Sequence, residues 1–160
     1  MTGPLLIPPA PNELDGEIRL PGDKSISHRA VMFAALSTGT SRIVNCSLAK
    51  DNKSTISAFK SLGVDITWEG TVVTVRSDGR ANLNHHEESI RTIDCGNSGT
   101  TIRLLCGILS ASAFDSCLDG DNSLRTRPMG RVADPLRRMG ASIHFQESSD
   151  CAPLRVNGRK

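Results

Sequence analysis

Hydrophobic and polar positions along the chain follow two spacings, one typical of helices and one typical of strands. Apolar residues recur every three or four positions, as in amphipathic helices, in residues 25–36, 51–63, 100–111 and 128–140. Shorter runs that read as strands lie in residues 17–20, 41–44, 64–68, 71–76, 91–94, 116–119, 141–146 and 151–156. Mixed in this order along the chain, these elements predict an α/β (α+β) fold class.

The side chains of the first helix predict where it starts and which of its faces is buried. Asp23 and Ser25 are both acceptable N-caps, so the helix is expected to start near one of them. The side chains expected on its buried stripe are Ile26, Ala30, Phe33 and Ala34, with Val31 and Leu36 at the edges.

Three further residues predict details of the second helix, the fourth helix and the last strand. Asp51 is expected to cap the second helix. Pro128 suits the first position of the fourth helix, because the N–H that proline lacks has no partner there. Pro153 is expected to confine the last strand to the edge of its sheet, because proline cannot donate to a strand ladder.

The order of elements repeats once. Gly22 and Gly96 stand at matching strand-to-helix turns 74 residues apart, and Gly63 and Gly140 end matching helices 77 residues apart. Each half reads strand, helix, strand, helix and then two strands, which predicts duplicated βαβαββ units. The expected organisation is an extended lead-in at residues 1–15, a first unit at 16–80, a linker loop at 81–89 and a second unit at 90–160.

Composition excludes several classes of function. The chain of 160 residues has 19 basic and 17 acidic residues and a net charge of +2, which is too balanced for a protein that binds nucleic acid through phosphate neutralisation. Aromatic residues make up 3%, which argues against base stacking. Five cysteines without a CxxC pair indicate reduced thiols and no zinc site. The absence of a long apolar run or a signal-peptide pattern predicts a soluble cytoplasmic protein.

Cations cluster where the first helix starts. Lys24, His28 and Arg29 fall in the first turn and a half, where free N–H groups already create a positive potential. Ser25 and Arg29 are four residues apart and share a helix face. Cations at such a place suit a site for an anion, either a phosphate or a carboxylate, whereas the alternative is a solvated charged turn.

Two later segments have similar chemistry. Residues 95–101 form a glycine turn at a helix start, where Asn97, Ser98 and Gly99 offer uncharged donors to an anion; an ordinary capped helix is the alternative. Arg125 and Arg127 precede the fourth helix, and an arginine there can hold a carboxylate by a bidentate pair. If the halves are duplicates, the turns converge on one ligand.

The three segments together resemble a known family. Residues 20–29 (LPGDKSISHR), 94–103 (DCGNSGTTIR) and 119–128 (DGDNSLRTRP) closely resemble three signatures of the 5-enolpyruvylshikimate-3-phosphate synthase family, in their usual order and spacing. The resemblance covers residues from about 14 to 160. It implies the enolpyruvyl transferase fold, an inside-out α/β barrel of two lobes with three βαβαββ repeats each, of which two of six are present here.

The resemblance also implies an activity and its residues. The family transfers the enolpyruvyl group of phosphoenolpyruvate to the 5-hydroxyl of shikimate 3-phosphate in aromatic amino acid biosynthesis, with no metal or organic cofactor. By position, Lys24, Ser25 and Arg29 would bind shikimate 3-phosphate. Lys24 would also bind phosphoenolpyruvate with the Gly99 backbone and Arg127, and Asn97 would shape that pocket. No nucleic acid or membrane partner is expected.

The chain departs from the family in length. After two repeats the resemblance calls for a third repeat and the opposite lobe, which supplies the acid and base and further phosphate-binding residues. The chain is therefore expected to be an N-terminal fragment of a monomeric enzyme, to contain no certain catalytic residue, and to be inactive without the missing C-terminal part.

Two alternatives stay open. UDP-N-acetylglucosamine enolpyruvyl transferase shares the implied fold, but its pattern has Lys-Asn where this chain has Lys24-Ser25, and a reactive cysteine in a loop that here, at residues 120–127, has none. Cys117 in the preceding strand is expected to be buried packing. The other alternative is a non-catalytic anion-binding fragment.

Three other polar features carry weaker expectations. His28, beside Lys24, is expected to support the site rather than to carry a proton. Asp51 is expected to cap its helix and, in the complete enzyme, could approach the substrate. Residues 85–88 (HHEE) resemble a metal cluster but lack a further ligand at usable spacing, so a solvated loop is favoured.

Overall fold

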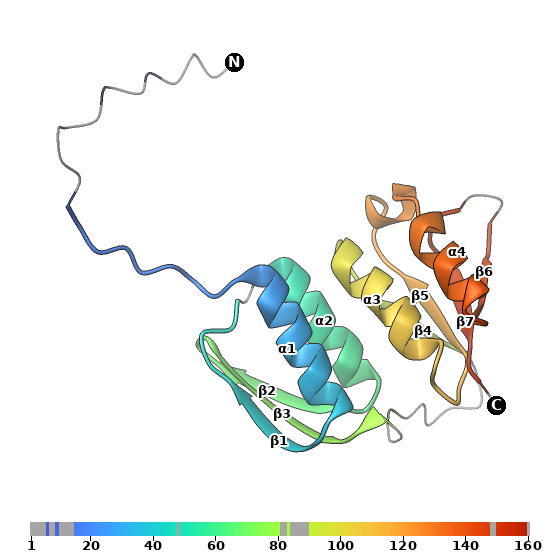
Figure 1. Ribbon diagram of the computed structural model, residues 1–160, viewed down its shortest axis with the longest axis horizontal. Helices are drawn as coiled ribbons and strands as arrows, with labels where there is room; N and C mark the ends of the chain where they lie inside the picture. Colours follow the sequence, from blue (N-terminus) through green and yellow to red (C-terminus); the bar gives the residue numbers. More distant parts are fainter. Residues whose placement is uncertain are drawn as a thin grey trace.

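The computed structural model describes residues 6, 9, 15–47, 49–80, 83, 90–147 and 150–159. Two units follow each other along the chain, and Figure 1 shows them side by side with the helices of the first unit covering one face of its sheet. The elements of the first unit are α1 (Lys24–Leu36), β1 (Thr38–Ile43), α2 (Lys50–Ser61), β2 (Asp65–Glu69) and β3 (Val72–Asp78).

The second unit has one more strand at its start. Its elements are β4 (Arg91–Asp94), α3 (Gly99–Leu109), β5 (Ser116–Asp119), the short 3-10 helix η2 (Leu124–Thr126), α4 (Gly130–Arg138), β6 (Ser142–Phe145) and β7 (Leu154–Asn157). The predicted strands at residues 91–94 and 116–119 are confirmed with the same bounds.

The two sheets share a strand order. The first is β1-β3-β2, with both pairs antiparallel, and the second contains β5-β7-β6 with the same antiparallel pairing. In the second sheet β4 adds to this arrangement by pairing parallel to β5. The common order agrees with a duplicated unit, whereas the predicted unit boundaries stay predictions.

Three helices form a continuous layer that links the units. The helix α2 contacts α1 on one side and α3 on the other. The apolar side chains Ile56 and Phe59 of α2, and Leu62 at its C-cap, are fully buried. Thr55, near the start of α2, lies 2.7 Å from Thr101, near the start of α3, so these two helix starts lie at the same end of the layer.

One predicted strand is absent. Residues 17–20 have no regular secondary structure, and Ile18 and Leu20 are exposed. A strand exists only through hydrogen bonds to a neighbouring strand, and within the described residues none lies beside this segment. The alternation of residues there was therefore insufficient to predict a strand.

The predicted buried stripe of α1 was wrong in part. Ala34 and Val31 are buried, but Ile26 and Phe33 are 62% and 66% exposed. The buried face instead carries Ser27 and other residues, namely His28, Val31, Met32, Ala34 and Ala35. Polar contacts favour this choice: the Ser27 hydroxyl donates to the Asp23 carbonyl oxygen and accepts from the Ser47 N–H, so Ser27 can be buried with its hydroxyl paired.

Two predicted helix starts also need correction. The N-cap of α2 is Ala49, and Asp51 lies inside the first turn, because its carboxylate pairs with Lys24 instead of capping the helix. The helix α4 starts at Gly130 rather than Pro128, with Met129 as its N-cap, and the Met129 N–H donates to the carbonyl oxygen of Asp150. In both places a residue near the helix start pairs with a group distant in sequence.

The last strand was placed wrongly at the sheet edge. β7 lies between β5 and β6. Pro153 precedes the strand, which begins at Leu154, so the missing N–H falls outside the ladder. Interior placement is therefore compatible with this proline.

The cysteines and the helix lengths bear on two further expectations. All five cysteines are free thiols, four of them buried and Cys151 partly exposed. Within the described segments no helix is long and apolar enough to span a bilayer. Most of the predicted lead-in at residues 1–15 and the polar stretch at residues 85–88 lie outside the described residues.

Candidate anion-binding site at three helix starts

The start of α1 positions Lys24. Asp23 is the N-cap, and its carboxylate accepts a hydrogen bond from the Ile26 N–H at 2.7 Å, so the helix begins at one of the two predicted residues. Lys24, the first residue of the helix, is exposed next to N–H groups that have no intrahelical partner. A cation and free donors thus lie together at one helix end.

An ion pair joins this end to the start of α2. Lys24 Nζ lies 2.9 Å from Asp51 Oδ2, and their side chains are 51% and 31% exposed. The Asn52 side-chain amide donates to the Lys24 carbonyl oxygen at 3.0 Å. A half-exposed pair contributes only about 0–1 kcal/mol, so the Lys24 ammonium can turn to an anionic ligand at small cost.

Ser25 and Arg29 are exposed on α1, as expected for ligand-binding side chains. Within the described part of the chain, no ion pair or side-chain hydrogen bond ties either of them to the other predicted site residues. The structure therefore places them on the same helix as Lys24 without fixing their side chains.

The start of α3 is built by a tight turn. The Asp94 carboxylate accepts from the Gly96 N–H at 2.7 Å, and Gly96 has a positive φ of 55°. Ser98 is the N-cap, and its hydroxyl oxygen accepts from the Thr101 N–H at 3.2 Å. Gly99 then begins the helix, so its backbone lies among donors without intrahelical partners, as in anion sites at helix starts.

The loop after β5 packs against this turn. The Asp121 N–H donates to the Gly96 carbonyl oxygen at 3.0 Å, and the Asn97 amide donates to both Asp121 carboxylate oxygens at 3.0 and 2.7 Å. The hydrogen bond from Asn97 is the main reason why the pKa of Asp121 is below its usual value. The turn and the loop therefore form one hydrogen-bonded structure.

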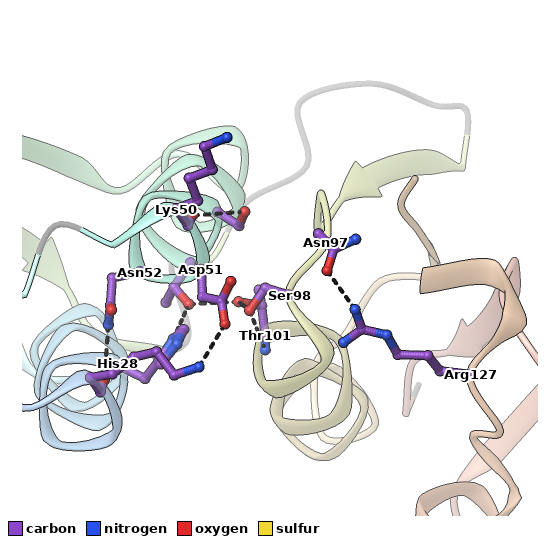
Figure 2. Close-up of polar contacts among 11 residues, drawn as sticks. His28, Lys50, Asp51, Asn52, Asn97, Ser98, Thr101 and Arg127 are labelled. Carbon is purple, nitrogen blue, oxygen red and sulfur yellow. Dashed lines mark hydrogen bonds and ion pairs between the residues drawn. The ribbon is translucent and has the colours of Figure 1, made fainter. Parts of the chain in front are cut away.

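Arg127 reaches the start of α3 from this loop. Its guanidinium donates to the Asn97 side-chain oxygen, and Figure 2 shows the two groups facing each other beside α3. A Cβ atom added to Gly99 would lie 3.1 Å from an Arg127 nitrogen. The predicted grouping of Gly99, Asn97 and Arg127 is thus present in space.

The two arginines of this loop differ in their partners. Arg125 forms an ion pair with Asp119, and its hydrogen bond is the main cause that lowers the pKa of that carboxyl group. Arg127 has no carboxylate partner among the described residues. Of the two arginines in this loop, Arg127 is therefore the one available to an anion beside Gly99.

Arg103 is a neighbour of the site that the sequence did not single out. A Cβ atom on Gly99 would lie 2.7 Å from one of its guanidinium nitrogens, and its Nε is buried without a hydrogen-bond partner among the described residues. Its position four residues after Gly99, on the same helix face, was the available signal. The start of α3 thus has two guanidinium groups beside it.

His28 lies behind Lys24 in the helix layer. It is 1% exposed, and its Nδ1 lies 2.6 Å from the Thr55 hydroxyl oxygen. Burial is the main cause that lowers the pKa of His28; the Asp51 charge opposes this shift and the Lys24 charge adds to it. A buried, neutral imidazole agrees with the expected supporting position.

This shift predicts a pH dependence of stability. Because the pKa of His28 is lower in the folded chain than its ordinary 6.5, the unfolded chain binds the proton more readily. The contribution of His28 is therefore complete above pH 6.5 and is lost as the pH falls below it toward the folded pKa. Urea unfolding at about pH 7.5 and about pH 5.5 should show lower stability at the acid pH.

Substitution separates His28 from the other groups that titrate. The variant H28N should show a smaller loss of stability on acidification than the unchanged chain, whereas H144N, at an exposed position, should keep the full loss. An equal loss in all three proteins would contradict the assignment to His28.

Within the described ranges no group of three His, Cys, Asp or Glu side chains could hold a metal ion. Cationic side chains gather at the helix starts, and the carboxylates there already have partners, which are Lys24, Asn97, Arg125 or backbone N–H groups. The arrangement suits small anions carrying phosphate and carboxylate groups.

Comparison with known proteins finds relatives along nearly the whole chain. Residues 8–160 match the family model of EPSP synthase (3-phosphoshikimate 1-carboxyvinyltransferase). A 3-phosphoshikimate 1-carboxyvinyltransferase of Bacillus thuringiensis subsp. konkukian is 50% identical over 152 residues, which are 95% of this chain and 35% of that protein. A protein of the same name from Caldicellulosiruptor saccharolyticus is 46% identical over 150 residues, which are 92% of this chain and 33% of that protein.

A solved structure shows the same fold. EPSP synthase from Acinetobacter baumannii superimposes with a TM-score of 0.82 at 41% identity, over 90% of this chain and 32% of that one. The fold that the resemblance implied is confirmed by this superposition, while the count of repeats stays a prediction. The chain spans about a third of the length of the relatives it matches.

Proposed function

The chain belongs to the EPSP synthase family, and from this premise we propose that it forms the N-terminal part of an enzyme with that activity. The reaction transfers the enolpyruvyl group of phosphoenolpyruvate to the 5-hydroxyl of shikimate 3-phosphate and releases phosphate. The observation that carries the proposal is the arrangement of the helix layer. It places the start of α1, with Lys24, and the start of α3, with Gly99 and the nearby Arg127, on the two sides of α2.

In this proposal, the start of α1 binds shikimate 3-phosphate. Lys24, Ser25 and Arg29 all lie exposed in its first two turns, where the helix N–H groups add positive potential. Arg29 offers a bidentate partner to a phosphate or a carboxylate, and Lys24 is a compact charge held only by a half-exposed ion pair. The free energy of binding comes mainly from charge-assisted hydrogen bonds to an anion.

The start of α3 binds phosphoenolpyruvate. The Gly99 backbone provides N–H groups, Arg127 provides a guanidinium, and Asn97 orients that guanidinium through its side-chain oxygen. Lys24 would contact this substrate as well, from the neighbouring helix. Two anionic substrates repel each other, and cations at the helix starts offset this repulsion when the reacting groups meet.

The contribution of this chain to the reaction is binding and orientation. Protonation of the enol carbon and attack of the 5-hydroxyl require an acid and a base, which we assign to the opposite lobe of the complete enzyme. No catalytic residue is proposed in this chain, and no metal or organic cofactor is required. The complete enzyme is proposed to be monomeric and cytoplasmic.

The observations do not favour the related transfer to UDP-N-acetylglucosamine. That enzyme has a reactive cysteine in the loop before its Arg-Pro, and residues 120–127 contain none. Cys117 is 5% exposed, and burial is the main cause that raises the pKa of its thiol, which makes it a poor nucleophile. A non-catalytic anion-binding fragment is the remaining alternative.

The decisive experiment measures the activity of this chain after it is joined to the part of the enzyme that it lacks. This chain is joined to the remainder of a relative such as the 3-phosphoshikimate 1-carboxyvinyltransferase of Bacillus anthracis, which is 49% identical over 152 residues. Phosphate release that requires both substrates is expected from the joined protein and not from the chain alone. A joined protein that folds and binds neither substrate would contradict the proposal, and UDP-N-acetylglucosamine as acceptor would point to the other enzyme.

A glycine substitution tests the phosphoenolpyruvate half of the site. In G99A the new methyl group would lie within 3.1 Å of the guanidinium nitrogens of Arg103 and Arg127, so these groups must move. Losing one charge-assisted hydrogen bond costs about 1.5–3 kcal/mol, which weakens phosphoenolpyruvate binding about 10- to 150-fold. Calorimetric titration of the joined protein measures this, with shikimate 3-phosphate binding expected to change less than about threefold.

The same helix supplies the matched control. Gly107 has nothing within 4 Å of a Cβ atom, so G107A should leave both affinities unchanged. If G99A bound phosphoenolpyruvate as tightly as G107A, Gly99 would not belong to that binding site.

A further inference from the structure

A chain of buried hydrogen bonds crosses the helix layer behind the site. His28 Nδ1 on α1 lies 2.6 Å from Thr55 Oγ1 on α2, which lies 2.7 Å from Thr101 Oγ1 on α3. The Thr101 hydroxyl donates to Ser98 Oγ at 2.7 Å. All four residues are at least 99% buried, and Figure 2 labels three of them, His28, Ser98 and Thr101.

The direction of this chain follows from counting protons. Each hydroxyl has one proton, and Thr101 uses its proton toward Ser98. Thr101 therefore accepts from Thr55, and Thr55 has no proton left for His28. His28 must donate from Nδ1, so the hydrogen bonds run in one direction from α1 to the N-cap of α3.

This direction fixes the tautomer of His28. With Nδ1 protonated and the imidazole neutral, Nε2 carries a lone pair, and it is buried without a partner among the described residues. The opposite tautomer would place two acceptors, Nδ1 and Thr55 Oγ1, 2.6 Å apart. The Nδ1–H form is therefore the one that this packing requires.

The two ends of the chain adjoin the two halves of the proposed site. His28 lies one helical turn after Lys24, and Ser98 directly precedes Gly99. The Ser98 oxygen that accepts from Thr101 also caps α3. The two hydrogen bonds of Thr55 join three different helices, whereas the bond between Thr101 and Ser98 lies within the first turn of α3.

We propose that His28, Thr55 and Thr101 are positioning residues: their one-directional hydrogen-bond chain holds the start of α3 at a fixed place relative to Lys24. The expected effect on substrate binding rests on the proposed function, whereas the hydrogen-bond chain and its effect on α3 do not depend on that function. Removing the Thr55 hydroxyl leaves a buried donor on His28 and a buried acceptor on Thr101 unpaired, so the helices must shift or admit water.

The first test uses the unchanged 160-residue chain without ligand. Nitrogen-15 NMR of the histidine rings distinguishes protonated from unprotonated nitrogens. The expected spectrum of His28 near pH 7.5 shows a protonated Nδ1 and an unprotonated Nε2. A protonated Nε2 with an unprotonated Nδ1 would reverse the hydrogen bonds and overturn the proposal.

The second test compares three variants. T55V keeps the shape of the side chain and removes the hydroxyl, T55S keeps the hydroxyl, and T74V changes a half-buried threonine on β3. Amide hydrogen exchange at Thr101 and at Ile102, on the first turns of α3, should be about three- to tenfold faster in T55V than in T74V. T55S should restore the slow exchange.

The outcomes separate positioning from general stability and from the proposed function. The proposal would be overturned if these amides exchanged equally fast in T55V and T74V. It would also be overturned if they exchanged as fast in T55S as in T55V. If T55V does not fold, the tautomer of His28 tests the proposal: the Nδ1–H form in both the unchanged protein and T55S would support it, and the Nε2–H form would overturn it. Phosphoenolpyruvate binding by the joined protein is measured separately: it should weaken about three- to tenfold in T55V and recover in T55S. If the unchanged joined protein binds no phosphoenolpyruvate, only the proposed function fails.

Discussion

Replacing Lys24 by methionine is expected to weaken the binding of both substrates to the joined protein. The ammonium group is the one charge proposed to contact shikimate 3-phosphate and phosphoenolpyruvate together. Each lost charge-assisted hydrogen bond costs about 1.5–3 kcal/mol, so each affinity should fall about 10- to 150-fold, and phosphate release should fall by more than either. Calorimetric titration with each substrate and a phosphate-release assay measure the three effects.

The fold should survive this change. The ion pair with Asp51 is half exposed and contributes about 0–1 kcal/mol, so urea unfolding of K24M should differ little from that of the unchanged protein. Lys60, in the last turn of α2, is the matched control, and K60M should retain both affinities. Equal binding by K24M and K60M would remove Lys24 from the site.

Replacing Gly120 by alanine is expected to separate the loop after β5 from the start of α3. A Cβ atom there would lie 2.3 Å from the Gly96 carbonyl oxygen and 2.4 Å from a Leu124 methyl carbon. Because one of these neighbours is backbone, the clash cannot be relieved by a side-chain rotation. The free energy of unfolding should fall by about 2–4 kcal/mol, measured by urea denaturation.

A functional effect should accompany the loss of stability. Moving the loop shifts Asp121 and Arg127 away from Asn97, so phosphoenolpyruvate binding should weaken even where the protein is folded. Gly16 has nothing within 4 Å of a Cβ atom, and G16A should change neither property. A G120A protein as stable as G16A would show that the two segments are not in close contact.

Local sequence signals were sufficient for much of the fold. Asp23 was recognised as a possible cap, and its carboxylate does accept the Ile26 N–H. The strands at residues 91–94 and 116–119 were also predicted correctly. These features depend on residues a few positions apart, so their physical causes are visible in a short stretch of sequence.

The candidate site was predicted in its parts but not in its connections. Cations at helix starts pointed to Lys24 and Arg127, and the structure adds the contacts of each with Asp51 and Asn97. Nothing in the sequence pointed to Thr55, because its partners are 27 and 46 residues away and a threonine inside a helix has no distinctive pattern.

The sequence by itself determined where most helices and strands form and which residues carry charge at the helix starts, because capping, glycine turns and periodicity act within a few residues. Only the tertiary structure decided which face of α1 is buried. Its apolar residues Ile26 and Phe33 are exposed, while Ser27 and His28 are buried, since their hydrogen-bond partners lie on other segments. Burial depends on the neighbours that a face meets, and those neighbours are set by the folding of the whole chain.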